Sequence, residues 1–183
     1  VGHGQLEFVR ELGGSQGALA INEGILSHLG YLQSTGLQVV WQTGPTFLPK
    51  AEEALKAMGL PQIKAFSFIK EMDLAYALSD VVISRAGAIA SAELAAAGKP
   101  VIFVPLPTAA EDHQTRNARA FADKNAAILL PNDRIKDELP RVLDTLLNDP
   151  GRLEKLATHI REFARPDATA RICDEIISLI DRQ

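Results

Sequence analysis

Apolar positions along the chain fall into short runs, and longer segments of helical periodicity separate these runs. Five of the runs are rich in strand-forming residues and are bounded by Gly, Pro, Asn or Asp, which is typical of buried strands. These five predicted strands are Val39–Trp41, Ile63–Ile69, Asp80–Ser84, Val101–Leu106 and Ala126–Leu130. The helical pattern predicts helices at Ala18–Leu32, Pro49–Met58, Ala88–Ala97, Gln114–Lys124, Arg134–Leu147, Gly151–Phe163 and Asp167–Ile180.

Alternation of strands and helices predicts βαβ units, and therefore a mostly parallel sheet with helices on both faces. We expect a Rossmann-like, doubly wound α/β fold with about six strands. The sequence shows no repeat, low-complexity stretch or internal linker, so residues 1–183 are expected to form a single domain.

The segment expected to form the first strand, Leu6–Leu12, departs from this pattern. A buried parallel strand is usually a continuous apolar run, but Arg10 and Glu11 interrupt this one. Two explanations are open. Residues 1–12 are partly foreign to the natural domain, or the strand lies at an edge of the sheet.

Composition narrows the function mainly by exclusion. The formal net charge is −4 and no cluster of Lys and Arg stands out, which argues against binding nucleic acid through its phosphates. The single cysteine, Cys173, excludes an intramolecular disulfide and a cysteine-rich zinc site, and it favours a reducing compartment. We find no signal peptide and no apolar run near the roughly 18 residues that a membrane span needs.

The first candidate ligand loop is "GGSQGA", Gly13–Ala18, which leads into a predicted helix. Its glycines, Gly13, Gly14 and Gly17, allow a ligand to approach the backbone, and Ser15 offers a hydroxyl. The helix start adds free N–H groups and a positive dipole end, which suit a nucleotide diphosphate. The loop matches neither G-x-G-x-x-G nor a P-loop, because no lysine follows. A tight turn with nothing bound explains the loop alone equally well.

The second candidate loop is "SRAGA", Ser84–Ala88, and it opens an alanine-rich helix through Gly87. Small side chains let this helix pack closely on the sheet and let a ligand approach its start. Glu93 lies in the second turn, where a carboxylate would repel a phosphate but would accept hydrogen bonds from the two hydroxyls of a ribose. The alternative is a solvated surface glutamate.

The third motif is "PLPTAAEDHQTRNA", Pro105–Ala118, in which Glu111 and Asp112 are placed as a cap and a first-turn acid of a helix. The amide of Gln114 carries a donor and an acceptor, so it can bind adjacent sugar hydroxyls. His113 suits a catalytic base, but a single histidine without an obvious partner is more often structural, and that reading is favoured.

These three motifs, in this order, resemble the MurG family. Its members are bacterial glycosyltransferases that move N-acetylglucosamine from UDP-GlcNAc to lipid I, making lipid II for peptidoglycan. The resemblance runs from about Gly13 to the C-terminus and includes Phe68–Ile69 and Pro166–Thr169. It implies the C-terminal, sugar-donor half of a GT-B glycosyltransferase. The N-terminal half, which binds the lipid acceptor and the membrane and holds the general base, would be missing.

The resemblance assigns the nucleotide part of UDP-GlcNAc to particular residues. Ser15 and Gln16 would lie against the diphosphate and the sugar. The main chain of Ile69 would meet the uracil edge. Ala88 and Ile89 would lie near the phosphates.

It also assigns the two sugars. Glu93 would hold the ribose hydroxyls, and Gln114 would contact the hexose with His113 beside it. No catalytic residue is expected in this half. No D-x-D motif occurs, so neither a metal nor another cofactor is expected. The full enzyme would transfer with inversion at the cytoplasmic face of the inner membrane.

Three alternatives are open. The chain could be a non-catalytic subunit of a split N-acetylglucosaminyltransferase, recruited by a membrane-anchored partner. A sugar-nucleotide epimerase of the same fold would need acid and base residues between two domains, which one domain does not supply. A ligand-free Rossmann-like scaffold would bind no nucleotide.

Overall fold

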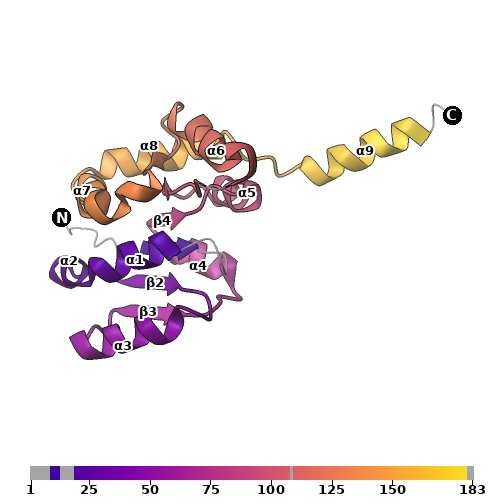
Figure 1. Cartoon of the computed structure of the whole chain (residues 1–183). Helices are drawn as coiled ribbons and strands as arrows, with labels where there is room; N and C mark the ends of the chain where they lie inside the picture. Colours follow the sequence, from indigo (N-terminus) through magenta and orange to yellow (C-terminus); the bar gives the residue numbers. More distant parts are fainter. Residues whose placement is uncertain (1–8, 13–18, 108, 181–183) are drawn as a thin grey trace.

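The computed structural model describes residues 9–12, 19–107 and 109–180, and its described strands form one parallel sheet (Figure 1). The strand order is β3-β2-β1-β4-β5-β6. The strands are β1 (Val9–Leu12), β2 (Val39–Gln42), β3 (Ile63–Phe66), β4 (Val81–Ser84), β5 (Val101–Phe103) and β6 (Ile128–Leu129). The predicted doubly wound α/β fold is therefore confirmed.

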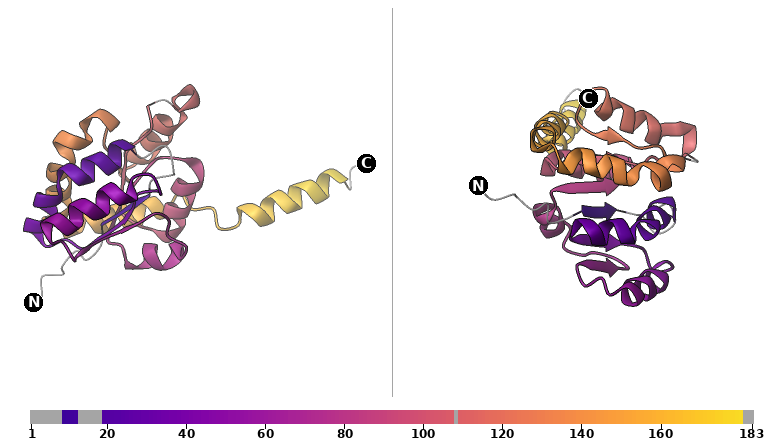
Figure 2. Two further views of the ribbon diagram at one scale, coloured as in Figure 1. Left: turned by 60° about the horizontal axis from the view of Figure 1, so that its bottom comes forward. Right: turned by 90° about the vertical axis from the view of Figure 1, so that its left-hand side faces the viewer.

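Helices cover both faces of this sheet (Figure 2). The α-helices are α1 (Leu19–Ser27), α2 (Leu29–Thr35), α3 (Leu48–Met58), α4 (Met72–Leu78), α5 (Ala88–Ala97), α6 (His113–Ala122), α7 (Ile135–Leu147), α8 (Pro150–Arg161) and α9 (Ala168–Ile180). Short 3₁₀ turns lie at Ala110–Asp112 and Asn132–Arg134.

Alternate residues of each buried strand face two separate cores. In β4, Val81 and Ile83 pack with α1, α2, α3 and α7 on one face. Val82 packs with α4, α5 and α6 on the other face. Because successive side chains of a strand point to opposite sides, a sheet covered on both faces favours continuous apolar strands such as β4.

The first strand lies in the middle of the sheet. Val9 pairs with Val39 of β2 on one side and with Val81 of β4 on the other. The explanation that this strand lies at an edge is therefore wrong. The chain builds outward from β1 in one direction through β2 and β3, and then returns to add β4, β5 and β6 on the other side. The junction of β1 and β4 is the topological switch point at which such folds bind ligands.

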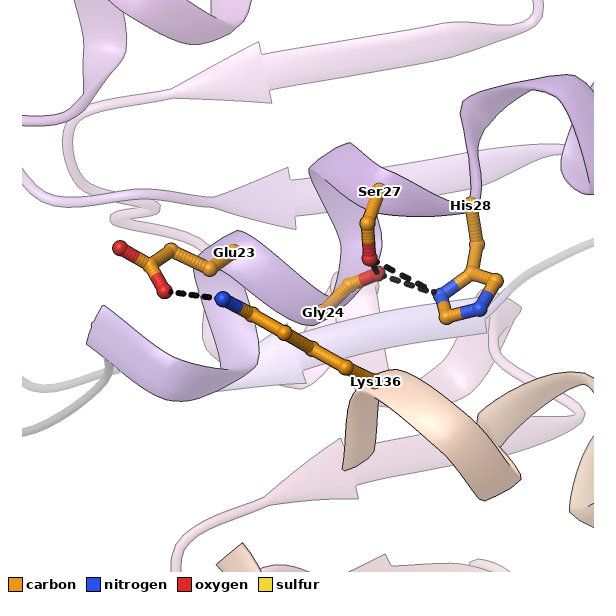
Figure 3. Close-up of polar contacts among 5 residues, drawn as sticks. All are labelled: Glu23, Gly24, Ser27, His28 and Lys136. Atoms are coloured by element: carbon orange, nitrogen blue, oxygen red, sulfur yellow. Dashed lines mark hydrogen bonds and ion pairs between the residues drawn. The ribbon is translucent and has the colours of Figure 1, made fainter. Parts of the chain in front are cut away.

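The predicted helix Ala18–Leu32 is divided into α1 and α2 at His28 (Figure 3). The carbonyl of Gly24 accepts a hydrogen bond from the Ser27 hydroxyl at 2.9 Å and lies 2.7 Å from Nδ1 of His28. The backbone N–H of His28 instead donates to the carbonyl of Ile25 at 3.0 Å. These contacts replace the regular i→i−4 bond and bend the chain.

Helix α1 packs closely on α7. A Cβ atom placed on Gly24 would lie 2.9 Å from Cγ1 of Ile135, a side chain that is 1% exposed. At the surface of the same contact, Lys136 Nζ lies 2.7 Å from Glu23 Oε2 (Figure 3). The hydrogen bond and the charge of Lys136 lower the pKa of Glu23. The missing side chain of Gly24 is thus what sets the distance between the two helices.

Helix α7 is also joined to α2. The hydroxyl of Tyr31 donates to Asp144 Oδ1 at 2.7 Å. Burial, followed by this hydrogen bond, raises the pKa of Tyr31 well above its ordinary value. This tyrosine–carboxylate pair lies on the sheet face that carries α1, α2, α3 and α7.

Helix α9 projects from the rest of the molecule in Figure 1 and in the left-hand view of Figure 2. None of its described residues is buried. It exposes five large aliphatic side chains, Ile172, Ile176, Ile177, Leu179 and Ile180. Among the described residues, no helix is long and apolar enough to cross a membrane.

We predict opposite effects of two glycine-to-alanine changes. Gly24→Ala should lower the free energy of unfolding by about 1–3 kcal/mol, because the added methyl group overpacks a buried contact with Ile135. Gly30→Ala is the matched control, since no described atom lies within 4 Å of an added Cβ there. It should raise the free energy by up to about 1 kcal/mol through helix propensity. Urea denaturation measures both, and a stabilising Gly24→Ala would contradict the close packing of α1 on α7.

Candidate nucleotide-binding site

The carboxyl ends of all the described strands lie at one edge of the sheet, because every pair is parallel. The loops into α3, α4, α5 and α6 therefore gather at this edge, which is where ligands bind in doubly wound folds. The loop 13–18 leads from β1 to α1. Ser15, Gln16 and the glycines Gly13, Gly14 and Gly17 lie outside the described residues, so their assignment stays a prediction.

The start of α5 is open to solvent. Gly87 is its N-cap residue, and within the described part of the chain no side chain caps this helix. A Cβ atom on Gly87 would meet no described atom within 4 Å, and Ile89 is 78% exposed. The first backbone N–H groups of a helix have no partner inside it. Ala88 and Ile89 therefore lie where the helix has free N–H groups and the positive end of its dipole, an arrangement that suits an anion.

Gly87 itself adopts an ordinary extended conformation, with φ of −69° and ψ of 149°. A residue with a side chain could adopt the same backbone, so glycine is not needed here for a positive φ. What its hydrogen atom provides is room above the helix start, which allows close approach of a ligand.

Two polar side chains, the buried Arg85 and the half-buried Asn117, fix the loops around this helix start. Arg85 is 8% exposed, and its Nη1 donates to the carbonyl of Val104 at 2.8 Å and to Asn132 Oδ1 at 2.7 Å. Asn117 on α6 donates from Nδ2 to the carbonyl of Ala86 at 3.0 Å. These bonds join the loops that follow β4, β5 and β6. A buried guanidinium needs such partners, so the loops are held in one arrangement.

Glu93 lies on an exposed face of α5 and contacts α4. The hydroxyl of Tyr76 donates to Glu93 Oε2 at 3.0 Å. Both residues line a groove of about 520 Å³ between the two helices. At its far end the ammonium group of Lys99 donates to the carbonyl of Ala77 at 3.1 Å. The solvent-exposed position of the carboxylate allows it to accept hydrogen bonds from a ligand.

Ile69 lies in the loop between β3 and α4 and is 9% exposed. Its backbone N–H donates to Gln42 Oε1 at 3.0 Å, and the Gln42 side chain is itself buried at the end of β2. Thr43 directly follows β2, and its backbone N–H donates to the carbonyl of Phe66 at 2.8 Å. The end of β2 thus holds the loop on which Ile69 lies.

Gln114 lies in the first turn of α6. Its Oε1 accepts the backbone N–H of Leu106 at 3.0 Å, which fixes the proline-rich loop before the helix. This bond uses the amide oxygen of Gln114 and leaves its amide nitrogen available as a donor. His113, the first residue of α6, has an exposed side chain.

The expected capping of α6 by its acids is wrong. Asp112 occupies the N-cap position, but its side chain makes no capping hydrogen bond among the described residues. Glu111 and Asp112 both have positive φ, at 51° and 54°. In this left-handed conformation the backbone turns sharply into the helix, and the carboxylate of Asp112 does not reach the first N–H groups.

The described site combines an uncapped helix start, the exposed carboxylate of Glu93, the buried amide of Gln42 and the half-buried amide of Gln114. No group of three or more His, Cys, Asp or Glu that could hold a metal gathers among the described residues. The main-chain N–H groups and the helix dipole give the start of α5 a positive potential, and Glu93 lies in the second turn of the same helix.

Comparison with known proteins agrees with this geometry. Residues 9–172 match the model of the glycosyltransferase family 28 C-terminal domain. The chain is a glycosyltransferase family 28 C-terminal domain. The family resemblance seen in the sequence motifs is confirmed.

Relatives of this family 28 domain carry the name UDP-N-acetylglucosamine--N-acetylmuramyl-(pentapeptide) pyrophosphoryl-undecaprenol N-acetylglucosamine transferase. The protein from Flavobacterium psychrophilum is 45% identical over 172 residues, which are 94% of this chain and 46% of that protein. The one from Nitratidesulfovibrio vulgaris is 41% identical over 92% of this chain and 47% of its own length. The chain thus spans about half the length of the curated relatives it matches.

Solved structures extend the comparison. The chain superposes on Acinetobacter baumannii MurG with a TM-score of 0.82 and 32% identity, covering 94% of this chain and 49% of that one. The calicheamicin glycosyltransferase CalG4 gives a TM-score of 0.71 at 16% identity, and S. aureus MnaA with UDP gives 0.74 at 13%. The last two share the fold alone. This family 28 domain therefore has the fold of one half of a GT-B glycosyltransferase.

We predict that Gln42→Leu lowers the free energy of unfolding by about 1–3 kcal/mol. The change removes the acceptor of the buried Ile69 N–H and leaves that donor without a partner. Chemical denaturation measures the effect. Gln38→Leu makes the same chemical change at an exposed position and should be nearly neutral. Equal effects of the two variants would contradict a structural role for the Gln42–Ile69 bond.

Proposed function

We propose that this chain is the UDP-GlcNAc-binding half of a transferase that makes lipid II from lipid I. The observation that carries the proposal is the identity of 45% over 94% of the chain with a protein named for that transfer. The geometry supports it independently, because an open helix start and an exposed carboxylate lie on the same helix. These two features suit a diphosphate and a ribose, which are adjacent in a nucleotide sugar.

In this proposal the diphosphate lies at the start of α5. The N–H groups of Ala88 and Ile89 stabilise its charge, and the loop 13–18, with Ser15 and Gln16, completes the cradle. As UDP leaves during transfer, negative charge grows on the diphosphate, and fixed main-chain dipoles favour that charge without having to reorganise. No metal ion is required for this role.

The nucleoside lies between α4 and α5. Glu93 accepts hydrogen bonds from the ribose hydroxyls, and the uracil edge meets the main chain of Ile69. The Ile69 N–H donates to Gln42 in the structure, so contact of uracil with that N–H requires Gln42 to release it. We infer that Gln42 is part of the base pocket for this reason.

The hexose lies against the start of α6. Gln114 donates from its amide nitrogen to a hexose hydroxyl while its oxygen stays bonded to Leu106, and His113 lies beside it. No group of this half removes the proton of the attacking hydroxyl. The proposal therefore assigns the general base, lipid I and the contact with the cytoplasmic face of the membrane to an N-terminal half, without which this chain binds UDP-GlcNAc but does not complete the transfer.

A second candidate is a sugar-donor-binding subunit of a split N-acetylglucosaminyltransferase. The exposed aliphatic side chains of α9 are the observation that supports this second candidate. They provide a surface that suits a separate partner chain as well as a second domain. The comparisons favour the first candidate. The relatives are about twice as long as the aligned region, so in them the matching domain is joined to a second half.

Calorimetric titration of the chain with UDP, UDP-GlcNAc, UDP-glucose and ADP tests the proposal. We expect UDP and UDP-GlcNAc to bind, and ADP to bind at least about 10-fold more weakly, because the proposed base pocket pairs the Ile69 main chain with a uracil edge once Gln42 releases it. UDP-glucose should bind more weakly than UDP-GlcNAc. Indifference to the base and the sugar would contradict the proposal.

Addition of EDTA is the control for the absence of a metal requirement. Because the proposed site stabilises the diphosphate with main-chain N–H groups, affinity for UDP should not change. Loss of binding in EDTA would assign the diphosphate to a metal ion instead.

Gln114→Ala should separate the two parts of the ligand. We expect unchanged affinity for UDP and an affinity for UDP-GlcNAc about 3- to 10-fold lower, which is the range for one lost hydrogen bond. Thr115→Ala, on the next residue of α6, is the matched control and should change neither. Equal loss for both ligands would show instead that Gln114 acts by holding the Leu106 loop.

A further inference from the structure

The hydroxyl group of Tyr76 contacts the carboxylate of Glu93 from the protein side. The side chain is 6% exposed and belongs to the core shared by α4, α5 and α6. Its hydroxyl reaches out of this core to donate to Glu93 Oε2 at 3.0 Å. Of the described residues of α4, Tyr76 is the one that is buried, so its position is set by packing and not by the carboxylate.

This contact decides how the carboxylate of Glu93 is presented. A carboxylate has two oxygens and about four lone-pair directions. Tyr76 occupies one direction on Oε2 from the protein side, which leaves Oε1 and the outward side of Oε2 to accept from a ligand. An exposed glutamate without such a partner would sample several rotamers, and ordering it on binding would cost conformational entropy. A fixed carboxylate avoids most of that cost.

We propose that Tyr76 is a positioning residue for ribose recognition, holding Glu93 in the rotamer that accepts the two ribose hydroxyls. This inference rests on the proposed function of Glu93. Because α4 directly follows the loop that carries Ile69, the same hydrogen bond keeps the ribose carboxylate in register with the base pocket. Tyr76 thus ties Glu93 to α4, while Gln42 separately ties the Ile69 loop to the end of β2.

A purely structural role for the hydroxyl would join α4 to α5 without affecting ribose. The two roles differ in one measurable quantity, the ratio of affinities for UDP and for 2′,3′-dideoxy-UDP. Dideoxy-UDP keeps the base and the diphosphate but lacks the hydroxyl groups that Glu93 would accept from. A positioning role changes this ratio, whereas a structural role changes both affinities together.

The experiment titrates four forms of the chain with both nucleotides: the unchanged sequence, Tyr76→Phe, Glu93→Ala and the double variant. We expect the unchanged chain to prefer UDP. Tyr76→Phe should lower the affinity for UDP about 3- to 10-fold and leave dideoxy-UDP unchanged, since one hydrogen bond to the carboxylate is lost. In the Glu93→Ala background, Tyr76→Phe should have no further effect, because the group it positions is gone.

Tyr31→Phe is the matched control. Tyr31 also donates to a carboxylate, that of Asp144 at 2.7 Å, but on helices of the opposite face of the sheet. It should leave the preference for UDP unchanged. Thermal denaturation of each variant measures the loss of stability separately from the loss of binding.

The outcomes separate the inference from the function on which it rests. If the unchanged chain binds the two nucleotides equally, Glu93 does not bind ribose, and this part of the proposed function fails. If it prefers UDP and Tyr76→Phe prefers UDP to the same degree, the positioning role of Tyr76 is overturned while the function stands. Equal loss of both nucleotides, or failure of Tyr76→Phe to fold, also assigns the hydroxyl a structural role and overturns the inference.

Discussion

Parallel pairing of the strands is the constraint on which the rest of the structure depends. It requires a helical crossover after each strand, so it places helices on both faces and encloses the sheet between two apolar cores. It also brings the loops that lead into the helices to one edge. The switch point between β1 and β4 divides these loops into two sets. The binding edge is therefore a consequence of the same pairing that forms the core.

At this edge the start of α5 is less stable than it could be, and the surface above it is open. A serine or aspartate at the N-cap of α5 would satisfy one of its first N–H groups and stabilise the helix by about 1 kcal/mol. Gly87 has no side chain to cap the helix, and the space above it stays open. The hydrogen bonds of Arg85 and Asn117 have a stabilising effect, because they hold the neighbouring loops in place. An open helix start on a fixed base is what a preorganised anion site requires.

The sequence predicted the architecture because its strongest signals are those of buried strands. Helix α5 matches its predicted bounds, since Gly87 and Gly98 enclose an unbroken helical run. Two features had no readable signal. Helix α4 exposes Leu74 and Leu78 and buries Tyr76. Its apolar residues therefore do not form the buried stripe from which a helix is predicted. The division at His28 depends on side-chain bonds to one carbonyl, which periodicity does not encode.

The residues that we propose to face the ligand could be selected from the sequence, but the groups that hold them in place could not. Glu93 and Gln114 stand out because a lone acid and an amide follow glycine- and proline-rich loops. Tyr76 and Gln42 act through partners 17 and 27 residues away along the chain, so only the folded structure brings them to the site. The roles of Ser15 and Gln16 stay predictions, because loop 13–18 lies outside the described residues.

The exposed isoleucine and leucine side chains of α9 have a consequence for the behaviour of the chain in water. Removing this aliphatic surface from water is favourable, whichever molecule covers it. Two copies of the chain can cover each other in the absence of a better partner. We therefore expect the domain alone to self-associate as its concentration rises, and to become more soluble when this surface is made polar.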